Sequence, residues 1–77
     1  MNIQQAAITF IAEPTAEHED KLIELLRAAK PEVSANAFIE YGCLEHKTVH
    51  VCDLDPDMDQ PTIWWEIDPN TGEISRY

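Results

Sequence analysis

The sequence predicts a small α+β domain in which one main amphipathic helix packs on an antiparallel sheet. Three observations support this fold class: a helical stripe of apolar residues between residues 15 and 30, several short runs rich in β-branched residues, and the turn sequence DPNTGE. A chain of 77 residues suits one small domain, so residues 1–77 are treated as a single acidic unit. The expected order is β-α-(α)-β-β-β, where the bracket marks a second helix that the sequence leaves open.

The N-terminal part contains an expected strand followed by the main helix. Residues 6–12, AAITFIA, are short, apolar and partly β-branched, which favours a strand. Thr15 is a suitable N-cap, because its hydroxyl can accept a hydrogen bond from the first turn of a helix. Leu22 and Leu26 then fall on one apolar stripe, and Pro31 ends the pattern. We therefore expect an amphipathic helix of about 15 residues.

The middle of the chain is ambiguous before it becomes strand-like. Residues 34–42, SANAFIEYG, allow a short helix that begins at Ser34 and ends at Gly42, or a strand, and we favour the helix. Residues 46–54, HKTVHVCDL, alternate in a way that is typical of a strand, with Val49 and Val51 on one face.

The C-terminal part is expected to form the rest of the sheet. An acidic, proline-bracketed loop at residues 55–61 precedes a strand at residues 62–68. In the turn DPNTGE, Pro69 suits the first corner and Gly72 suits a position with positive φ. Residues 73–77 then return as the last strand.

The charge of the chain restricts its partners. Fifteen acidic and five basic residues give a net charge of −10 and a pI near 4.4. Such a chain repels nucleic acid and anionic lipid, so we expect no direct binding to either and expect attraction to basic protein surfaces. No apolar run approaches the roughly 20 residues that span a bilayer. The first residues, MNIQQAAITF, do not have the pattern of a signal peptide, so we expect a soluble, cytoplasmic protein with reduced cysteines.

The segment CLEHKTVHVC holds four side chains of the types that bind zinc: Cys43, His46, His50 and Cys52. On a strand, His46 and His50 lie some 13 Å apart at about 3.3 Å per residue, too far for one ion to join them. A disulfide between the two cysteines is compatible with a hairpin but not with a reducing compartment. The acidic surroundings also disfavour a nucleophilic thiolate. We therefore expect no metal or cofactor, and a metal-binding or redox module remains the alternative.

The second half of the chain carries the strongest functional signal. Residues 48–75 contain no lysine or arginine but seven acidic residues. Alternate carboxylates on an extended segment lie about 7 Å apart, close to the spacing of phosphates along one nucleic-acid strand. This run does not fit an EF-hand, because Met58 replaces the glycine and Trp64 replaces the final glutamate. It indicates either a solvated acidic loop or a mimic of nucleic acid that occupies a basic groove.

Two neighbouring tryptophans extend this surface. Neighbours on a strand face opposite ways, so Trp65, which alternates with Ile63 and Ile67, is expected in the core and Trp64 outside. If the DPNTGE turn pairs its two ends, Trp64 lies opposite Tyr77, and the two form an aromatic anchor beside carboxylates. The alternative is that the second helix or a homodimer partner covers this face.

These observations predict a non-enzymatic binding protein. It would inhibit or regulate a partner by occupying a basic surface, including the nucleic-acid-binding surfaces of proteins, as anti-defence proteins of phages and mobile elements do. The sequence contains neither a phosphate-cradling loop nor a Ser/His/Asp arrangement, so we expect no enzyme activity. A small dimeric ligand-binding or enzyme domain is a further alternative. The expected partner-binding residues are Asp53, Asp55, Asp57, Asp59, Trp64, Glu66, Asp68 and Tyr77.

A short family resemblance lies in the first part of the chain. Residues 8–26, ITFIAEPTAEHEDKLIELL, resemble the strand-to-helix start of dimeric ferredoxin-like monooxygenase domains. The resemblance covers this stretch alone and no family motif follows it, so we assign no family.

Overall fold

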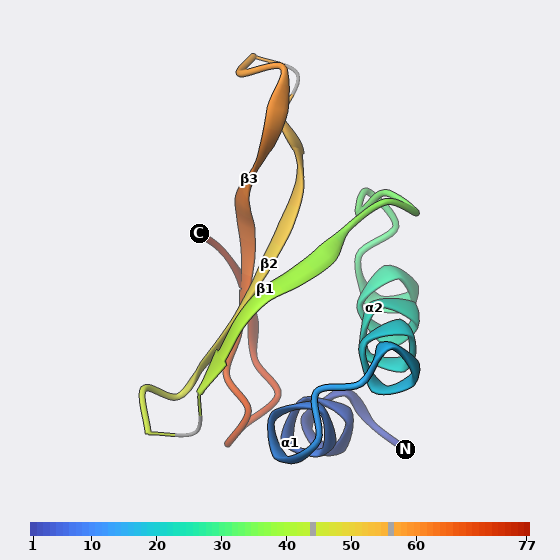
Figure 1. Ribbon diagram of the computed structural model, residues 1–77, viewed down its shortest axis with the longest axis vertical. Coiled ribbons are helices and arrows are strands. Elements are labelled where there is room, and N and C mark those ends of the chain that lie inside the picture. The colour runs from blue at the N-terminus through green and yellow to red at the C-terminus, as the bar shows by residue number, and fades with distance from the viewer. Residues whose placement is uncertain (44, 56) are drawn as a thin grey trace.

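The computed structural model describes residues 1–43, 45–55 and 57–77. Two helices, α1 (Ile3–Ala12) and α2 (Ala16–Ala29), precede four strands. The strands are β1 (Phe38–Cys43), β2 (Thr48–Asp55), β3 (Gln60–Ile67) and β4 (Ile74–Arg76). They form one antiparallel sheet in the order β1-β2-β3-β4, and both helices lie to one side of it (Figure 1). The predicted α+β class is therefore confirmed, with two helices on a four-stranded sheet.

The first element is a helix, so the predicted strand at residues 6–12 is wrong. Asn2 caps α1: its side chain accepts the backbone N–H of Gln5, and the Gln5 side chain accepts the backbone N–H of Asn2. The apolar residues of α1 follow helical spacing and pack on the core: Ile3, Ala6, Ala7, Phe10 and Ile11. This spacing outweighs the β-branched composition that suggested a strand. The strand-to-helix resemblance of residues 8–26 therefore does not describe the fold.

Helix α2 confirms the predicted amphipathic helix. The Thr15 hydroxyl accepts the backbone N–H of His18, and the helix ends at Ala29, ahead of Pro31. Leu22 and Leu26 are fully buried against the sheet and α1. Local capping and the apolar stripe thus determine this element as expected.

The favoured helix at residues 34–42 is wrong, and its strand alternative is correct. Ser34 begins a turn rather than a helix, and β1 then pairs with β2 through partners such as Ile39 and Val51. Ile39 thereby joins the buried core. Tertiary pairing decided between two conformations that the local sequence allowed about equally.

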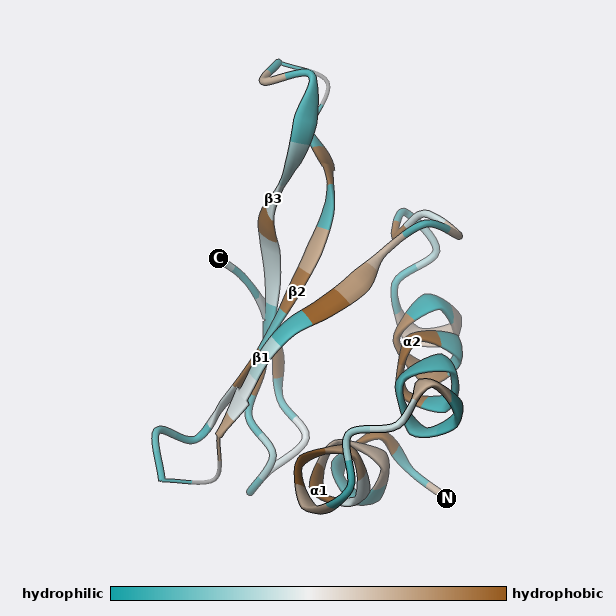
Figure 2. Ribbon diagram, in the orientation of Figure 1, coloured by the Kyte–Doolittle hydropathy of each residue, from teal (hydrophilic) through white to brown (hydrophobic). Residues whose placement is uncertain are grey.

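The core lies between the helices and one face of the sheet. Val49, Val51, Trp65 and Ile67 are buried there, which confirms the prediction that Trp65 points inward. Figure 2 shows hydrophobic stretches along β1, β2 and both helices. The turn after β3 also forms as predicted, because the backbone N–H of Asp68 donates to the carbonyl oxygen of Glu73 and Gly72 has a φ of 80°.

The long β2–β3 hairpin gives the molecule its shape. Its far end extends beyond the helices and the other strands, along the longest axis of the molecule (Figure 1). The residues at that end belong to the acidic run, so the fold places this run at the tip of a projection.

Candidate interaction surface

The tip of the β2–β3 hairpin is a tight turn that Asp55 organises. The carbonyl oxygen of Asp55 accepts the backbone N–H groups of Met58 and Asp59, and its side chain accepts the backbone N–H of Asp57 at 2.9 Å. Asp59 has a positive φ of 52°, a conformation that aspartate tolerates better than most residues. Asp57 and Asp59 are both exposed. The turn therefore holds Asp55 in place and presents the other two carboxylates to solvent.

Two apolar side chains accompany these carboxylates. Leu54 is 59% exposed and Met58 is 56% exposed, at positions that pack against nothing in the core. An exposed leucine and methionine beside carboxylates combine apolar contact area with charge, and protein interfaces place apolar side chains at the centre and polar groups at the rim. We refer to residues 54, 55 and 57–59 as the hairpin tip; Pro56 lies outside the described residues.

Asp53, the first member of the acidic run, does not belong to this exposed surface. It is 6% exposed and points toward the helix side, where Ser34 donates to it from its backbone N–H at 2.9 Å and from its hydroxyl at 2.6 Å. Burial raises the pKa of Asp53, but the hydrogen bonds from Ser34 outweigh burial and hold it below its usual value. Asp53 therefore connects β2 to the segment that follows α2.

The run also lacks the even spacing expected of an extended strand. Asp53 is buried within β2, whereas Asp57 and Asp59 lie in the turn. The predicted ladder of carboxylates at phosphate-like intervals is therefore wrong. What remains at the surface is a compact acidic projection.

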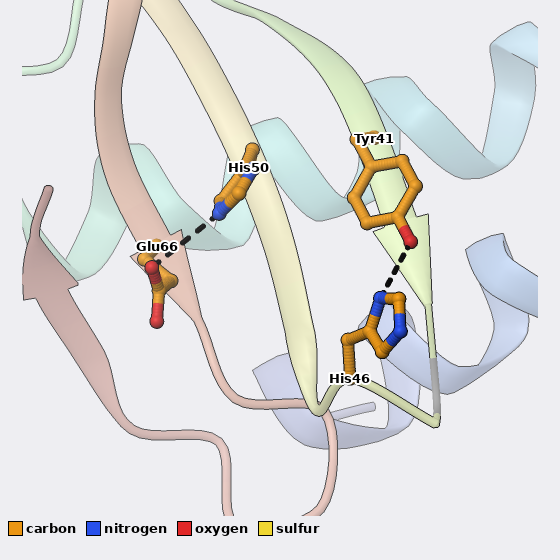
Figure 3. A network of polar contacts seen from close by, with 4 residues as sticks. All are labelled: Tyr41, His46, His50 and Glu66. Carbon is orange, nitrogen blue, oxygen red and sulfur yellow. Dashed lines mark hydrogen bonds and ion pairs between the residues drawn. The ribbon is translucent and has the colours of Figure 1, made fainter.

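The sheet face turned away from the helices carries a second group of polar and aromatic residues. Its central row follows the strand register, in which Tyr41 lies opposite His50 and His50 lies opposite Glu66. In Figure 3 these side chains stand in front of the strands, with the helices behind. His50 Nε2 lies 3.4 Å from a carboxylate oxygen of Glu66, whose side chain is 40% exposed.

Tyr77 completes this group, whereas Trp64 is half-buried and packs against the core. The backbone N–H of Tyr77 donates to the carbonyl oxygen of Trp64, which confirms the predicted register. The two rings have different neighbours, however. Tyr77 is 70% exposed and its ring makes a T-shaped contact with His50 at 5.0 Å between centroids, whereas the guanidinium of Arg76 lies 4.2 Å from the centroid of the Trp64 ring. The prediction of an outward pair of Trp64 and Tyr77 is therefore wrong: Trp64 is half-buried against the core under Arg76, and Tyr77 is exposed without it.

Asp68, the last predicted site residue, serves the turn. Its side chain accepts the backbone N–H of Asn70 at 2.8 Å, and its carbonyl oxygen accepts the N–H of Gly72. It is half-buried at the opposite end of β3 from the hairpin tip. The fold therefore separates Asp68 from the exposed carboxylates of the tip.

Of the four zinc-type side chains near β2, Cys43, His46 and His50 contact Tyr41, whereas Cys52 contacts Glu40. The Tyr41 hydroxyl and His46 Nδ1 lie 2.9 Å apart, and the buried Cys52 thiol donates to Glu40 at 2.9 Å (Figure 3 shows the Tyr41–His46 contact). Within residues 1–43, 45–55 and 57–77, no three cysteine, histidine or acidic side chains converge to hold a metal ion. Both cysteines are free thiols. The four residues therefore form no common site in this structure.

The two thiols differ in their chemistry. The backbone N–H of His46, followed by the hydroxyl of Tyr41, lowers the pKa of Cys43. Burial, followed by the carboxylate of Glu40, raises the pKa of Cys52 to about 11. Cys43 is therefore the more easily ionised of the two cysteines.

Several of these surface residues were not identified from the sequence. Tyr41, Leu54, Met58 and Arg76 all lie on or beside the predicted surface. Leu54 could have been found from the sequence, because it directly precedes the acidic, proline-bracketed loop at residues 55–61. The position of Arg76 over Trp64 could not, because it depends on the pairing of β3 with β4.

The alternative of a ligand-binding domain would need a pocket. A groove of about 470 Å³ lies between α1 and α2, lined by residues that include Thr9, Glu17 and His18. It contains none of the predicted partner-binding residues. Among the described residues, neither helix is long and apolar enough to cross a membrane.

Comparison with known proteins provides no relative: no family model, curated protein or solved structure matches this chain.

Proposed function

We propose that this chain is a non-enzymatic binding protein that inhibits or regulates a partner by docking its hairpin tip into a basic surface. The observation that carries the proposal is the projecting turn on which Asp57 and Asp59 are exposed next to Leu54 and Met58. Basic nucleic-acid-binding surfaces of proteins are suitable targets, because their exposed lysines and arginines attract carboxylates. Anti-defence proteins of phages and mobile elements act in this way, and that comparison rests on charge and size.

The distribution of charge supports this assignment. The bases nearest to the tip in sequence are Lys47, in the turn at the other end of β2, and Arg76, which lies over Trp64. Within the described residues, the carboxylates of the tip form no ion pair with a lysine or arginine. Their field is therefore directed to solvent, where it can speed the encounter with a basic partner.

The apolar residues of the tip have a different role in the proposal. Exposed charges at the rim of an interface mainly affect the rate of association, whereas buried apolar contacts slow dissociation. Leu54 and Met58 provide such contact area once water is excluded. The tip thus combines electrostatic steering with an apolar anchor.

The test uses two variants of equal charge. The tip variant carries Asp55→Asn, Asp57→Asn and Asp59→Asn. The control variant carries Glu13→Gln, Glu24→Gln and Glu32→Gln, three exposed carboxylates outside the hairpin. Both have a net charge of −7, by adding three to −10.

The partner is first captured from the source cells with the wild-type chain and identified by mass spectrometry. Its affinity is then measured against salt for all three proteins. We expect the tip variant to bind at least about tenfold more weakly at low salt, while the control loses about twofold, and we expect wild-type binding to weaken as salt rises. Equal losses of affinity in both variants, or an affinity that does not change with salt, would contradict the proposal.

A further inference from the structure

The uncovered sheet face contains a continuous group of rings. The Tyr41 and His50 ring centroids are 5.9 Å apart, and those of His50 and Tyr77 are 5.0 Å apart. Tyr41 is 42% exposed and Tyr77 is 70% exposed, so both tyrosines present ring surface to solvent. In the described part of the chain, both helices lie behind the strands that carry these rings, and neither covers this side of the sheet (Figure 3). The half-buried His50 between them brings the two tyrosines into one surface.

A carboxylate lies beside these rings. Glu66 is on the neighbouring strand, opposite His50, and its side chain is 40% exposed. Within the described residues it forms no ion pair with a lysine or arginine, and its ionisable neighbour is His50, at 3.4 Å. Aromatic ring surface therefore lies next to a partly exposed carboxylate that, among the described residues, has no lysine or arginine partner.

This combination matches the chemistry of a guanidinium group. A guanidinium is planar, stacks on aromatic rings and donates two parallel hydrogen bonds to a carboxylate. A lysine ammonium is a compact and strongly hydrated charge that cannot make both contacts in the same way. The chain itself shows the stacking half of this chemistry, because the Arg76 guanidinium lies 4.2 Å from the centroid of Trp64.

We propose that Tyr41, His50, Glu66 and Tyr77 form a binding site for an arginine side chain of a protein partner. This inference rests on the proposed function, because it names the residue of the basic surface that the sheet face recognises. In the complex, the hairpin tip supplies long-range attraction, and the sheet face supplies preference for arginine over lysine.

A second copy of this chain is the less suitable occupant. Two copies that share this face would bring their Glu66 carboxylates together, and each copy carries a net charge of −10. That repulsion opposes self-association at low salt. An arginine-bearing partner instead complements both the local carboxylate and the charge of the whole chain.

The experiment uses two peptides of equal charge, acetyl-GRGRG-amide and acetyl-GKGKG-amide, in an NMR titration of the ¹⁵N-labelled full-length chain. We expect the arginine peptide to bind about two- to fivefold more tightly than the lysine peptide, which is the range for a cation on an exposed ring. The largest amide shifts should fall at Tyr41, His50, Glu66 and Tyr77.

Three further proteins separate the contributions. Glu66→Gln and Tyr41→Ala should remove the preference for arginine, and Tyr41→Phe should retain it, because phenylalanine keeps the ring. The tip variant should weaken both peptides equally and leave their ratio unchanged. Circular dichroism of each variant establishes that it is folded.

The two proposals fail in different ways. Equal affinity for both peptides, with binding that still weakens as salt rises, would overturn the arginine site and leave the proposed function standing. Shifts confined to the tip or the helices would do the same. Failure of both peptides to bind at low salt would overturn both proposals. Salt-dependent self-association that Glu66→Gln strengthens would identify a second copy as the occupant.

Discussion

Asp53 offers the sharpest test of how the structure is held together. Its carboxylate accepts three hydrogen bonds: from the Ser34 hydroxyl at 2.6 Å, the Ser34 N–H at 2.9 Å and the Leu54 N–H at 2.8 Å. A hydrogen bond to a charged group contributes about 1.5–3 kcal/mol, but the three share one carboxylate and do not add. We therefore expect Asp53→Ala to lower the free energy of unfolding by about 3 kcal/mol, whereas Ser34→Ala, which removes only the hydroxyl, should cost about 1 kcal/mol.

Thermal and urea unfolding followed by circular dichroism measure this effect. For a domain of this size, 1 kcal/mol corresponds to roughly 4–8 °C in Tm, so Asp53→Ala should lower Tm by roughly 12–24 °C. Asp57→Ala is the matched control: this aspartate is exposed, and its removal should cost less than about 0.5 kcal/mol. An Asp53→Ala protein that unfolds within about 2 °C of the wild type would refute the reasoning, because a buried carboxylate with three donors cannot be lost at so little cost.

The same carboxylate makes the free energy of unfolding depend on pH, with lower stability at acidic pH. The pKa of Asp53 is lower in the folded protein, so folding favours the ionised form. The stabilisation is fully present above the pKa of an unfolded aspartate, about 3.9, and is lost as the pH falls through the lower folded value. The stability difference between the wild type and Asp53→Asn should therefore shrink below about pH 4. A difference that stays constant down to pH 2 would contradict this origin.

Three further experiments test individual features of the chain. At neutral pH, Cys43 should react with iodoacetamide faster than Cys52, because the N–H of His46 lowers the pKa of Cys43 while burial raises the pKa of Cys52 to about 11. Peptide mapping by mass spectrometry measures both reaction rates. Equal rates would contradict the difference in pKa. Gly72→Ala should lower the free energy of unfolding by about 1–2 kcal/mol, because φ at this position is 80° and the added Cβ would lie 3.2 Å from a side chain of α1. Urea unfolding measures this change, and an unchanged midpoint would show that the turn adapts to the substitution. Asn2→Ala should lower the free energy of unfolding by about 1 kcal/mol in the same assay, because it removes the capping box of α1. A protein of unchanged stability would show that packing alone stabilises α1.

Local sequence signals predicted the elements that depend on nearest neighbours. Helix α2 follows from the Thr15 cap and the stripe that contains Leu22 and Leu26, all within one segment. The turn before β4 follows from Pro69 and Gly72, because only certain residues suit those backbone angles. Such features need no information from the rest of the chain, and for that reason the sequence was enough.

The error at residues 6–12 occurred where composition and spacing disagreed. Residues 6–12 are partly β-branched, yet Ala6, Ala7 and Phe10 follow helical spacing once Ile3 is included. The capping box of Asn2 and Gln5 supports that interpretation in the sequence itself. Spacing is the better guide, because a helix in a small domain is stabilised chiefly by burying one face.

The candidate site was predicted in part. The base-free acidic segment placed Asp57, Asp59 and Glu66 among the candidates, and all three are exposed or partly exposed. The sequence could not separate them from Asp53, since only the contact with Ser34, 19 residues away, shows that this carboxylate is buried.

By itself, the sequence determined the size of the domain, its α+β class, its strong negative charge and the elements that local capping and turn chemistry specify. Only the tertiary structure decided that α1 packs against the core, that β1 is a strand, and that Asp53 faces inward while Asp57 and Asp59 project. The physical reason is the range of the interactions. Caps and turns act over a few residues, whereas strand pairing and burial depend on segments that are far apart in the chain.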